Sequence, residues 1–111
     1  MPPEVPLETW QADIPWGHAD YERPVIFLGH RAHDKLAVLR VSSNLDLMDP
    51  DRDFLIQETH ENFAATGLDS SSYAEAQMMI LSPEKFTKAM GAIVGKMRRD
   101  FEEWIESGVL R

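Results

Sequence analysis

The sequence contains no cysteine among its 111 residues. This absence excludes disulfide bonds, a thiolate nucleophile and zinc sites with cysteine ligands. No apolar run approaches the roughly 18 residues that a membrane-spanning helix needs. The start, MPPEVPLETW, has neither the basic residues nor the apolar segment of a secretory signal. We therefore expect one soluble domain in the cytoplasm, without contact with a membrane.

Positive charge is scarce, because 11 Lys and Arg stand against 19 Asp and Glu and give a formal net charge of −8. Residues 1–75 hold 5 basic and 14 acidic side chains, whereas residues 76–111 hold 6 and 5. Phosphate contacts need Lys and Arg, so this balance argues against a general nucleic-acid-binding surface. The C-terminal third is best suited to an anion, although the solvated face of a helix would carry the same basic residues.

The hydrophobic pattern predicts strands after an irregular start. Residues 1–16 are rich in proline and tryptophan and have little periodicity, so we expect an irregular N-terminal arm there. Apolar and alternating runs bounded by turn residues then predict four strands, over 24–29, 36–42, 54–58 and 72–81.

The last predicted strand has two different faces. Its Tyr73, Glu75 and Gln77 alternate with the small residues Ala74 and Ala76. Successive side chains of a strand point to opposite sides, so one face should be polar and the other small and apolar. This is the pattern of a half-buried strand.

Two helices are predicted after the strands. Ser82, Pro83 and Glu84 are typical of a helix start. Further on, apolar residues recur at helical spacing and predict an amphipathic helix over 96–107. Strands followed by a terminal helix, without βαβ alternation, favour a mainly β, α+β fold. We expect a small, partly open antiparallel barrel over residues 17–111.

A run of aspartates imitates a calcium-binding loop. Asp49, Asp51 and Asp53 have the spacing of its first ligands. However, Phe54 stands where the sharp turn needs glycine, and His60 stands where the bidentate glutamate belongs. We therefore predict no metal site.

The segment GHADYERPVIFLG offers candidate catalytic residues. Arg23 and Pro24 come just before an apolar strand, where a charged residue is most often simply solvated. Strand ends also hold side chains in fixed directions, so the same position suits chemistry. His18 lies close by in sequence and pairs a candidate base with a cation, as phosphodiester cleavage requires.

Several short segments follow one another along the chain in an order that is informative. GH and RPVIFLG are followed by VLRVSS, a strand that ends in a serine pair, and then by TGLDSSSYAEAQMMILS and KAMGAIVGKMRRDFEEWIES. In this order they resemble the PemK/MazF-like toxins of type II toxin–antitoxin systems. The resemblance covers roughly residues 17–107.

The resemblance implies an SH3-like barrel that binds a cognate antitoxin and cleaves single-stranded RNA without a metal or other cofactor. It implies contact with DNA only through an antitoxin complex. Arg23 would stabilise the pentavalent phosphorane, Ser42 would hold a phosphate oxygen, and His18 would be a base or a substrate contact. Ser43 and Gln77 would bind the substrate.

The resemblance also implies a homodimer. Barrels of this size often expose an edge strand and an apolar patch, and a two-fold dimer would bury such a surface. Met78, Met79 and Ile80 are the candidates for this interface.

The chain departs from the family where several members carry an Arg and an Asp in an R-x-D-Q motif. These two groups are proposed as acid and base in one branch of the family. Here Ala74 and Ala76 take their places, and alanine cannot transfer a proton. Two alternatives to the endoribonuclease therefore stay open. One is an inactive protein-binding module, and the other is a topoisomerase poison like the CcdB toxins, for which Trp104 in the last helix is the only hint.

Overall fold

The structure of this chain is a computed structural model that describes residues 2–16 and 19–111. The described residues form six strands and one α-helix: β1 (Glu8–Trp16), β2 (Ala19–Ala32), β3 (Lys35–Ser42), β4 (Phe54–Ile56), β5 (Ser72–Leu81), β6 (Phe86–Ala92) and α1 (Gly95–Glu106). The strands pair antiparallel in one sheet with the order β4-β5-β3-β2-β1-β6. The predicted mainly β, α+β fold with a C-terminal helix is confirmed.

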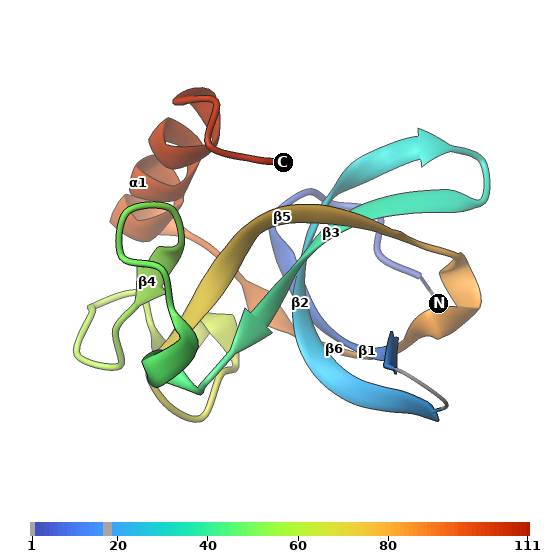
Figure 1. The fold of residues 1–111 in the computed structure, drawn as a ribbon, viewed down its shortest axis with the longest axis horizontal. Coiled ribbons are helices and arrows are strands. Elements are labelled where there is room, and N and C mark those ends of the chain that lie inside the picture. The colour runs from blue at the N-terminus through green and yellow to red at the C-terminus, as the bar shows by residue number, and fades with distance from the viewer. Residues whose placement is uncertain (1, 17–18) are drawn as a thin grey trace.

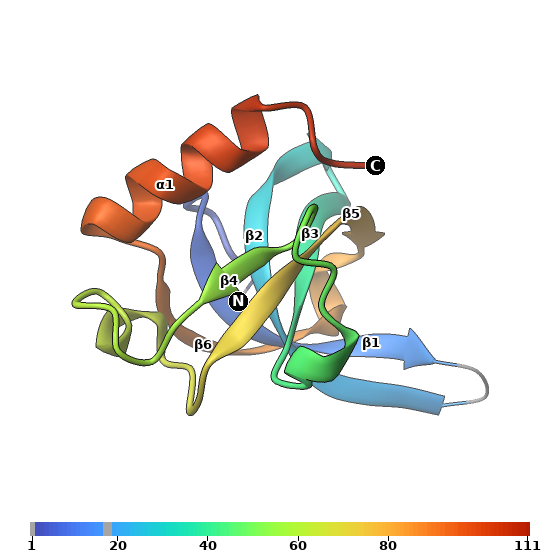
Figure 2. The ribbon, with the colours of Figure 1, turned by 60° about the vertical axis from the view of Figure 1, so that its left-hand side comes forward.

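The sheet curls into a partly open barrel, and α1 lies across one end of it (Figure 1 and Figure 2). The segment after β4 packs on β6 and brings the two edges of the sheet toward each other. Gly91 of β6 approaches this segment so closely that a Cβ atom would lie 2.1 Å from the Ala65 carbonyl oxygen. Thr9 of β1 donates a buried hydrogen bond of 2.6 Å to the Thr66 carbonyl. Only glycine at position 91 permits the backbone of β6 to come this close to the segment after β4.

The strand β2 contributes to two hydrophobic clusters, one on each side of the sheet. Ile26 belongs to the cluster beneath α1, together with Phe101. Val25 and Phe27 point the other way, into a cluster shared with Ile14 of β1. A strand that is buried on both faces needs a continuous apolar run, and this need explains the sequence PVIFLG.

The irregular arm predicted over residues 1–16 is wrong for residues 8–16. They form β1, which lies between β2 and β6 and is therefore an interior strand. The register of β1 against β6 shifts between Thr9 and Trp10 and again between Gln11 and Ala12. The extra residues at both shifts lie on β6, so the alternation of apolar and polar residues within β1 is intact, and the prolines of residues 1–16 obscured it.

The short helix predicted from Ser82 is also wrong. Pro83–Lys85 form a single 3₁₀ turn, and β6 follows at once. The Ser82 hydroxyl donates a hydrogen bond of 2.6 Å to the Glu84 carboxylate, which lowers the pKa of Glu84, and does not cap a helix. Phe86 instead packs edge-on against Trp10 of β1 at a centroid distance of 6.0 Å. The last helix begins and ends within one residue of its predicted bounds.

Candidate functional site

Arg23 lies within β2, where it pairs with Ala12 of β1, and not at the strand start that the sequence predicted; Ser42 is the last residue of the neighbouring β3. Val25 of β2 pairs with Arg40 of β3. Continuing this antiparallel register by two residues places Arg23 opposite Ser42, with both side chains on the same face. Both residues also line one open groove, together with Ser43. Three of the predicted site residues are therefore brought together.

The groove has a volume of about 530 Å³ and lies between the β1–β2 hairpin, the end of β3 and the loop before β5. Arg23 is the only cation among the described residues that line it, whereas Glu22 and Asp69 supply two carboxylates. The remaining lining is mostly polar and includes Gln11, Asn44, Ser70 and Ser72. A ligand held here would be recognised mainly by hydrogen bonds, since the local charge favours an anion only close to Arg23.

The hydroxyl of Ser42 already has one role in the fold. Its Oγ accepts a hydrogen bond of 3.1 Å from the backbone N–H of Asn44, which fixes the chain as it leaves β3. A serine hydroxyl has two acceptor lone pairs and one O–H donor. The O–H of Ser42 therefore remains able to donate to a phosphate oxygen.

Arg23 is exposed, and two contacts set its position. Its Nη1 donates to the Glu22 carbonyl at 3.1 Å, and its guanidinium carbon lies 5.6 Å from the centre of the Tyr21 ring. The structure records no ion pair for Arg23 with any described residue. Its charge is thus oriented by neighbours but not neutralised by a carboxylate in contact.

A second pair of charged side chains lies on the same face and was missed by sequence reasoning. Arg40 of β3 bonds to both carboxylate oxygens of Glu75 of β5, at 2.5 and 2.9 Å. The hydrogen bond that Arg40 donates to Glu75 is the main cause that raises the pKa of Arg40 above its ordinary value. The two side chains are 29% and 28% exposed, so solvent and ligands can reach them.

The register of β5 shows why Glu75 was overlooked. Ser42 pairs with Tyr73, so the site face of β5 carries Tyr73 and Glu75. Ala74 and Ala76 are 0% and 5% exposed and point to the interior. The family resemblance placed the missing acid and base at the two alanines, whereas the carboxylate stands one position away. The alternation of polar and small residues in YAEAQ was the signal that could have found it.

Gln77 does not reach the groove. The ladder between β3 and β5 is irregular there, because Leu39 pairs with Met78 whereas Val41 pairs with Ala74. Such a bulge re-aims side chains, and Gln77 is exposed beside it. Gln77 is not among the described residues that line the groove, and its predicted role in substrate binding stays a prediction.

The bulge is held in place by long-range hydrogen bonds. Asp53 accepts from the Ala76 N–H at 2.9 Å. The chain terminus adds two backbone bonds of 3.1 Å, from Arg111 N–H to Ala76 and from Met78 N–H to Arg111.

Three further predictions concern His18, metal sites and membrane-spanning helices. His18 lies outside the described residues. Within the described part of the chain, no three His, Asp or Glu side chains come together as a metal site. The same residues contain no helix long and apolar enough to cross a membrane.

The fold is similar to that of an endoribonuclease of known structure. It matches an endoribonuclease solved in complex with its cognate antitoxin from a Mycobacterial species, with a TM-score of 0.67 and 10% sequence identity. The match covers 100% of this chain and 98% of that one. No family model matches the sequence, and no curated protein matches it significantly. At this identity the likeness establishes a shared fold over the whole chain.

Proposed function

We propose that this chain is the toxin of a type II toxin–antitoxin system and cleaves single-stranded RNA without a metal. The observation that carries the proposal is one face of the sheet on which Arg23, Ser42 and the Arg40–Glu75 pair, all at least partly exposed, lie on adjoining strands. Its support from comparison is the fold shared with an endoribonuclease. The assignment to the PemK/MazF-like branch and the SH3-like description of the barrel belong to the proposal.

The proposed reaction is an attack by a ribose 2′-OH on the adjacent phosphate. The Glu75 carboxylate takes the proton of the 2′-OH, and the 2′ oxygen then forms a bond to phosphorus. The bond from phosphorus to the 5′ oxygen breaks, which leaves a 2′,3′-cyclic phosphate and a 5′-OH. The leaving oxygen takes its proton from water or from His18. A base, a proton for the leaving group and a cation are what this chemistry needs.

The cationic and hydroxyl groups have separate roles in this scheme. Arg23 stabilises the negative charge that builds on the phosphoryl oxygens, a role that suits its planar and permanently charged guanidinium. Ser42 donates its O–H to one of these oxygens. Arg40 is a positioning residue, because its two hydrogen bonds fix the orientation of the Glu75 carboxylate.

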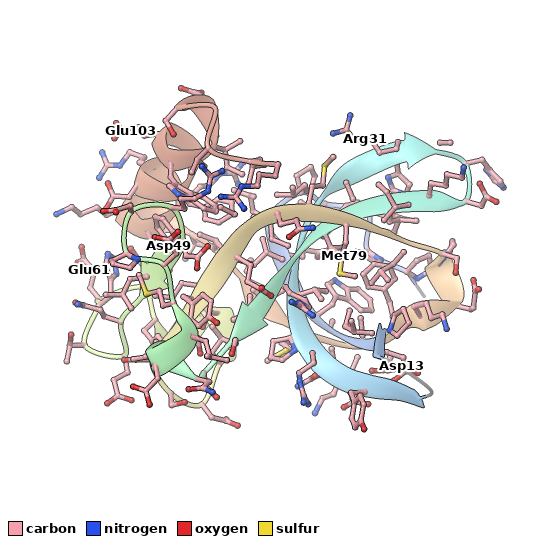
Figure 3. The ribbon with its side chains drawn as sticks, viewed as in Figure 1. Asp13, Arg31, Asp49, Glu61, Met79 and Glu103 are labelled. Carbon is pink, nitrogen blue, oxygen red and sulfur yellow. The ribbon has the colours of Figure 1, made fainter. Side chains whose placement is uncertain are left out.

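The proposed partners follow from the same function. They are a cognate antitoxin, single-stranded RNA and a second copy of the chain, all in the cytoplasm, with DNA reached only through an antitoxin complex. Of the three residues predicted for the dimer interface, Ile80 is 44% exposed, whereas Met78 and Met79 are half-buried. In Figure 3, Met79 lies against the sheet.

An inactive protein-binding module is the second candidate, and one observation favours it. The groove holds two carboxylates for a single cation, and the whole chain has a net charge of −8, so both repel phosphate.

The one feature that favoured a topoisomerase poison, Trp104, is explained by packing within this chain. The Trp104 indole N–H donates a hydrogen bond of 2.7 Å to the Arg52 carbonyl, and the Trp104 ring packs on Phe54 and Phe101.

Expression of the chain under an inducible promoter, followed by incubation of purified protein with a long single-stranded RNA in EDTA, tests the proposal. The endoribonuclease predicts growth arrest and cleavage that ends in cyclic phosphates. Normal growth together with intact RNA would contradict it and would favour the binding module.

A further inference from the structure

We propose that Tyr21 is a stacking platform for an unpaired nucleobase next to the Arg23 site. The inference rests on the proposed function, because its ligand is single-stranded RNA. It adds a binding subsite that reads the planar face of a base, where the rest of the site acts on the sugar and the phosphate.

The position of Tyr21 suits a platform. Among the large apolar side chains that the described part of the chain exposes, Tyr21 is the aromatic one, and it is 47% exposed. It precedes Arg23 by two residues on β2, so both side chains lie on the same face of the strand. Its cross-strand partner is Ile14 of β1, which is only 1% exposed and belongs to a hydrophobic cluster. One part of the Tyr21 side chain is therefore backed by the protein while another faces solvent.

The contact between Arg23 and Tyr21 links a base to a phosphate. The guanidinium lies over the ring at 5.6 Å from its centre. Unpaired bases of single-stranded RNA stack on tyrosine rings and on arginine planes in the same way. When Arg23 turns toward a phosphoryl group, the ring face that it covers becomes available to the neighbouring base. The phosphate and the base would then bind together.

A purely structural role for Tyr21 makes a different prediction. An exposed cation–π pair stabilises a fold little, so its simplest structural purpose is to orient Arg23. In that case the loss of the ring would weaken phosphate binding whether or not the nucleotides carry bases. A stacking platform instead acts only on a nucleic acid that has bases.

The test uses two fluorescein-labelled oligonucleotides of equal length that cannot be cleaved. One is a single-stranded 2′-O-methyl RNA of mixed sequence, and the other has the same backbone with abasic positions. Binding is followed by fluorescence anisotropy for the wild type, Tyr21→Ala and Tyr21→Trp. Val5→Ala serves as a control, because Val5 is an exposed apolar residue that does not line the groove. Circular dichroism verifies that each variant is folded.

We expect Tyr21→Ala to weaken binding of the base-carrying probe by about five- to a hundredfold, the range measured for loss of one stacked base. Tyr21→Trp should bind as tightly as the wild type or more tightly, and the abasic probe should not distinguish the variants. Equal weakening of both probes, or no effect on either, would overturn the inference, and so would a wild type that binds neither probe.

The two hypotheses can fail separately. If the wild type leaves unmodified RNA intact but binds the base-carrying probe through Tyr21, the endoribonuclease is contradicted and the stacking platform stands. If the wild type cleaves RNA and Tyr21→Ala binds and cleaves like it, only the platform is contradicted.

Discussion

Arg40 and Glu75 form a two-pronged ion pair that bridges β3 and β5, with Nε 2.5 Å from Oε2 and Nη2 2.9 Å from Oε1. A pair that is partly open to solvent contributes only about 0–1 kcal/mol to stability. Its importance therefore lies in its place on the face that carries Ser42. The pair places a carboxylate, held by two hydrogen bonds from a cation, on the same face of the sheet as Ser42.

Replacement of Glu75 by glutamine should separate activity from stability. Glu75→Gln keeps the shape of the side chain but removes the base, so cleavage should fall by about 10²–10⁴-fold. The free energy of unfolding should change by no more than about 1 kcal/mol. Initial rates on RNA and urea unfolding measure the two effects, with Glu103→Gln on the exposed surface of α1 as the matched control (Figure 3). A Glu75→Gln protein with wild-type rates would remove this residue from the mechanism.

Trp104 should be a structural residue. Its ring packs on Phe54 at 5.4 Å and on Phe101 at 5.3 Å, and its N–H bonds to the loop before β4. Trp104→Ala should lower the free energy of unfolding by about 3 kcal/mol, the low end for a large aromatic because this one is half-buried. Trp104→Phe should cost less, since it keeps most of the packing and loses one hydrogen bond. An unchanged melting temperature for Trp104→Ala would mean that the ring is free to meet a partner.

Asp53 should stabilise the chain without calcium. One carboxylate oxygen accepts from the Ala76 N–H and the other from the Asp49 N–H, each at 2.9 Å. Asp49 lies in the loop that passes close to α1 (Figure 3). Asp53→Ala leaves two backbone donors without their partner and should cost about 1–3 kcal/mol. Thermal unfolding with and without calcium tests both statements.

The matched control for Asp53 is Asp51→Ala. The Asp51 side chain is exposed, so its loss should stay within about 0.5 kcal/mol. A melting temperature that rises with calcium in the wild type would show that the aspartate run is a metal site after all.

The parts of the fold that the sequence predicts well are those with an uninterrupted period. The strand over 72–81 coincides with β5, and the last helix is displaced by one residue. The strand β1 also keeps its alternation, since Trp10, Ala12 and Ile14 alternate with polar residues, but the prolines of residues 1–16 argued against a strand there. After Ser82 the residues are typical of a helix start, but the chain forms β6 instead, because β6 pairs with β1, a segment far away in the sequence.

The candidate site was predictable only in part for a related reason. The family pattern marks Arg23 and Ser42, and both line the groove, although Arg23 lies within β2 and not at its end. The role of Glu75 depends on which residue of β5 stands beside Ser42, and a shift of one residue moves every side chain to the other face. The alternation in YAEAQ separates Glu75 from its alanine neighbours, but register is set by long-range pairing, so the sequence alone could not place Glu75 on the same face as Ser42.

The proposed dimer can be tested by light scattering. The mass at micromolar concentration should be twice that of the 12.7 kDa chain. Ile80→Asp should shift the mass toward one chain, because it places a charge on an exposed apolar side chain of the predicted interface. Leu47→Asp, at another exposed apolar residue, should leave the mass unchanged. A wild type with the mass of one chain at this concentration would contradict the proposed dimer.

The cleavage rate of Arg23→Ala in EDTA tests the central claim most directly. Arg23 is the one cation among the described groove residues, so its loss should slow cleavage of single-stranded RNA by about 10²–10³-fold while stability stays within about 1 kcal/mol. Arg23→Lys should recover only part of the rate, because lysine lacks the planar fork. Arg99→Ala, at an exposed cation on α1, should cleave like the wild type. Metal-independent cleavage that depends on Arg23 but not on Arg99 is the predicted result, and cleavage that persists unchanged in Arg23→Ala would contradict the account.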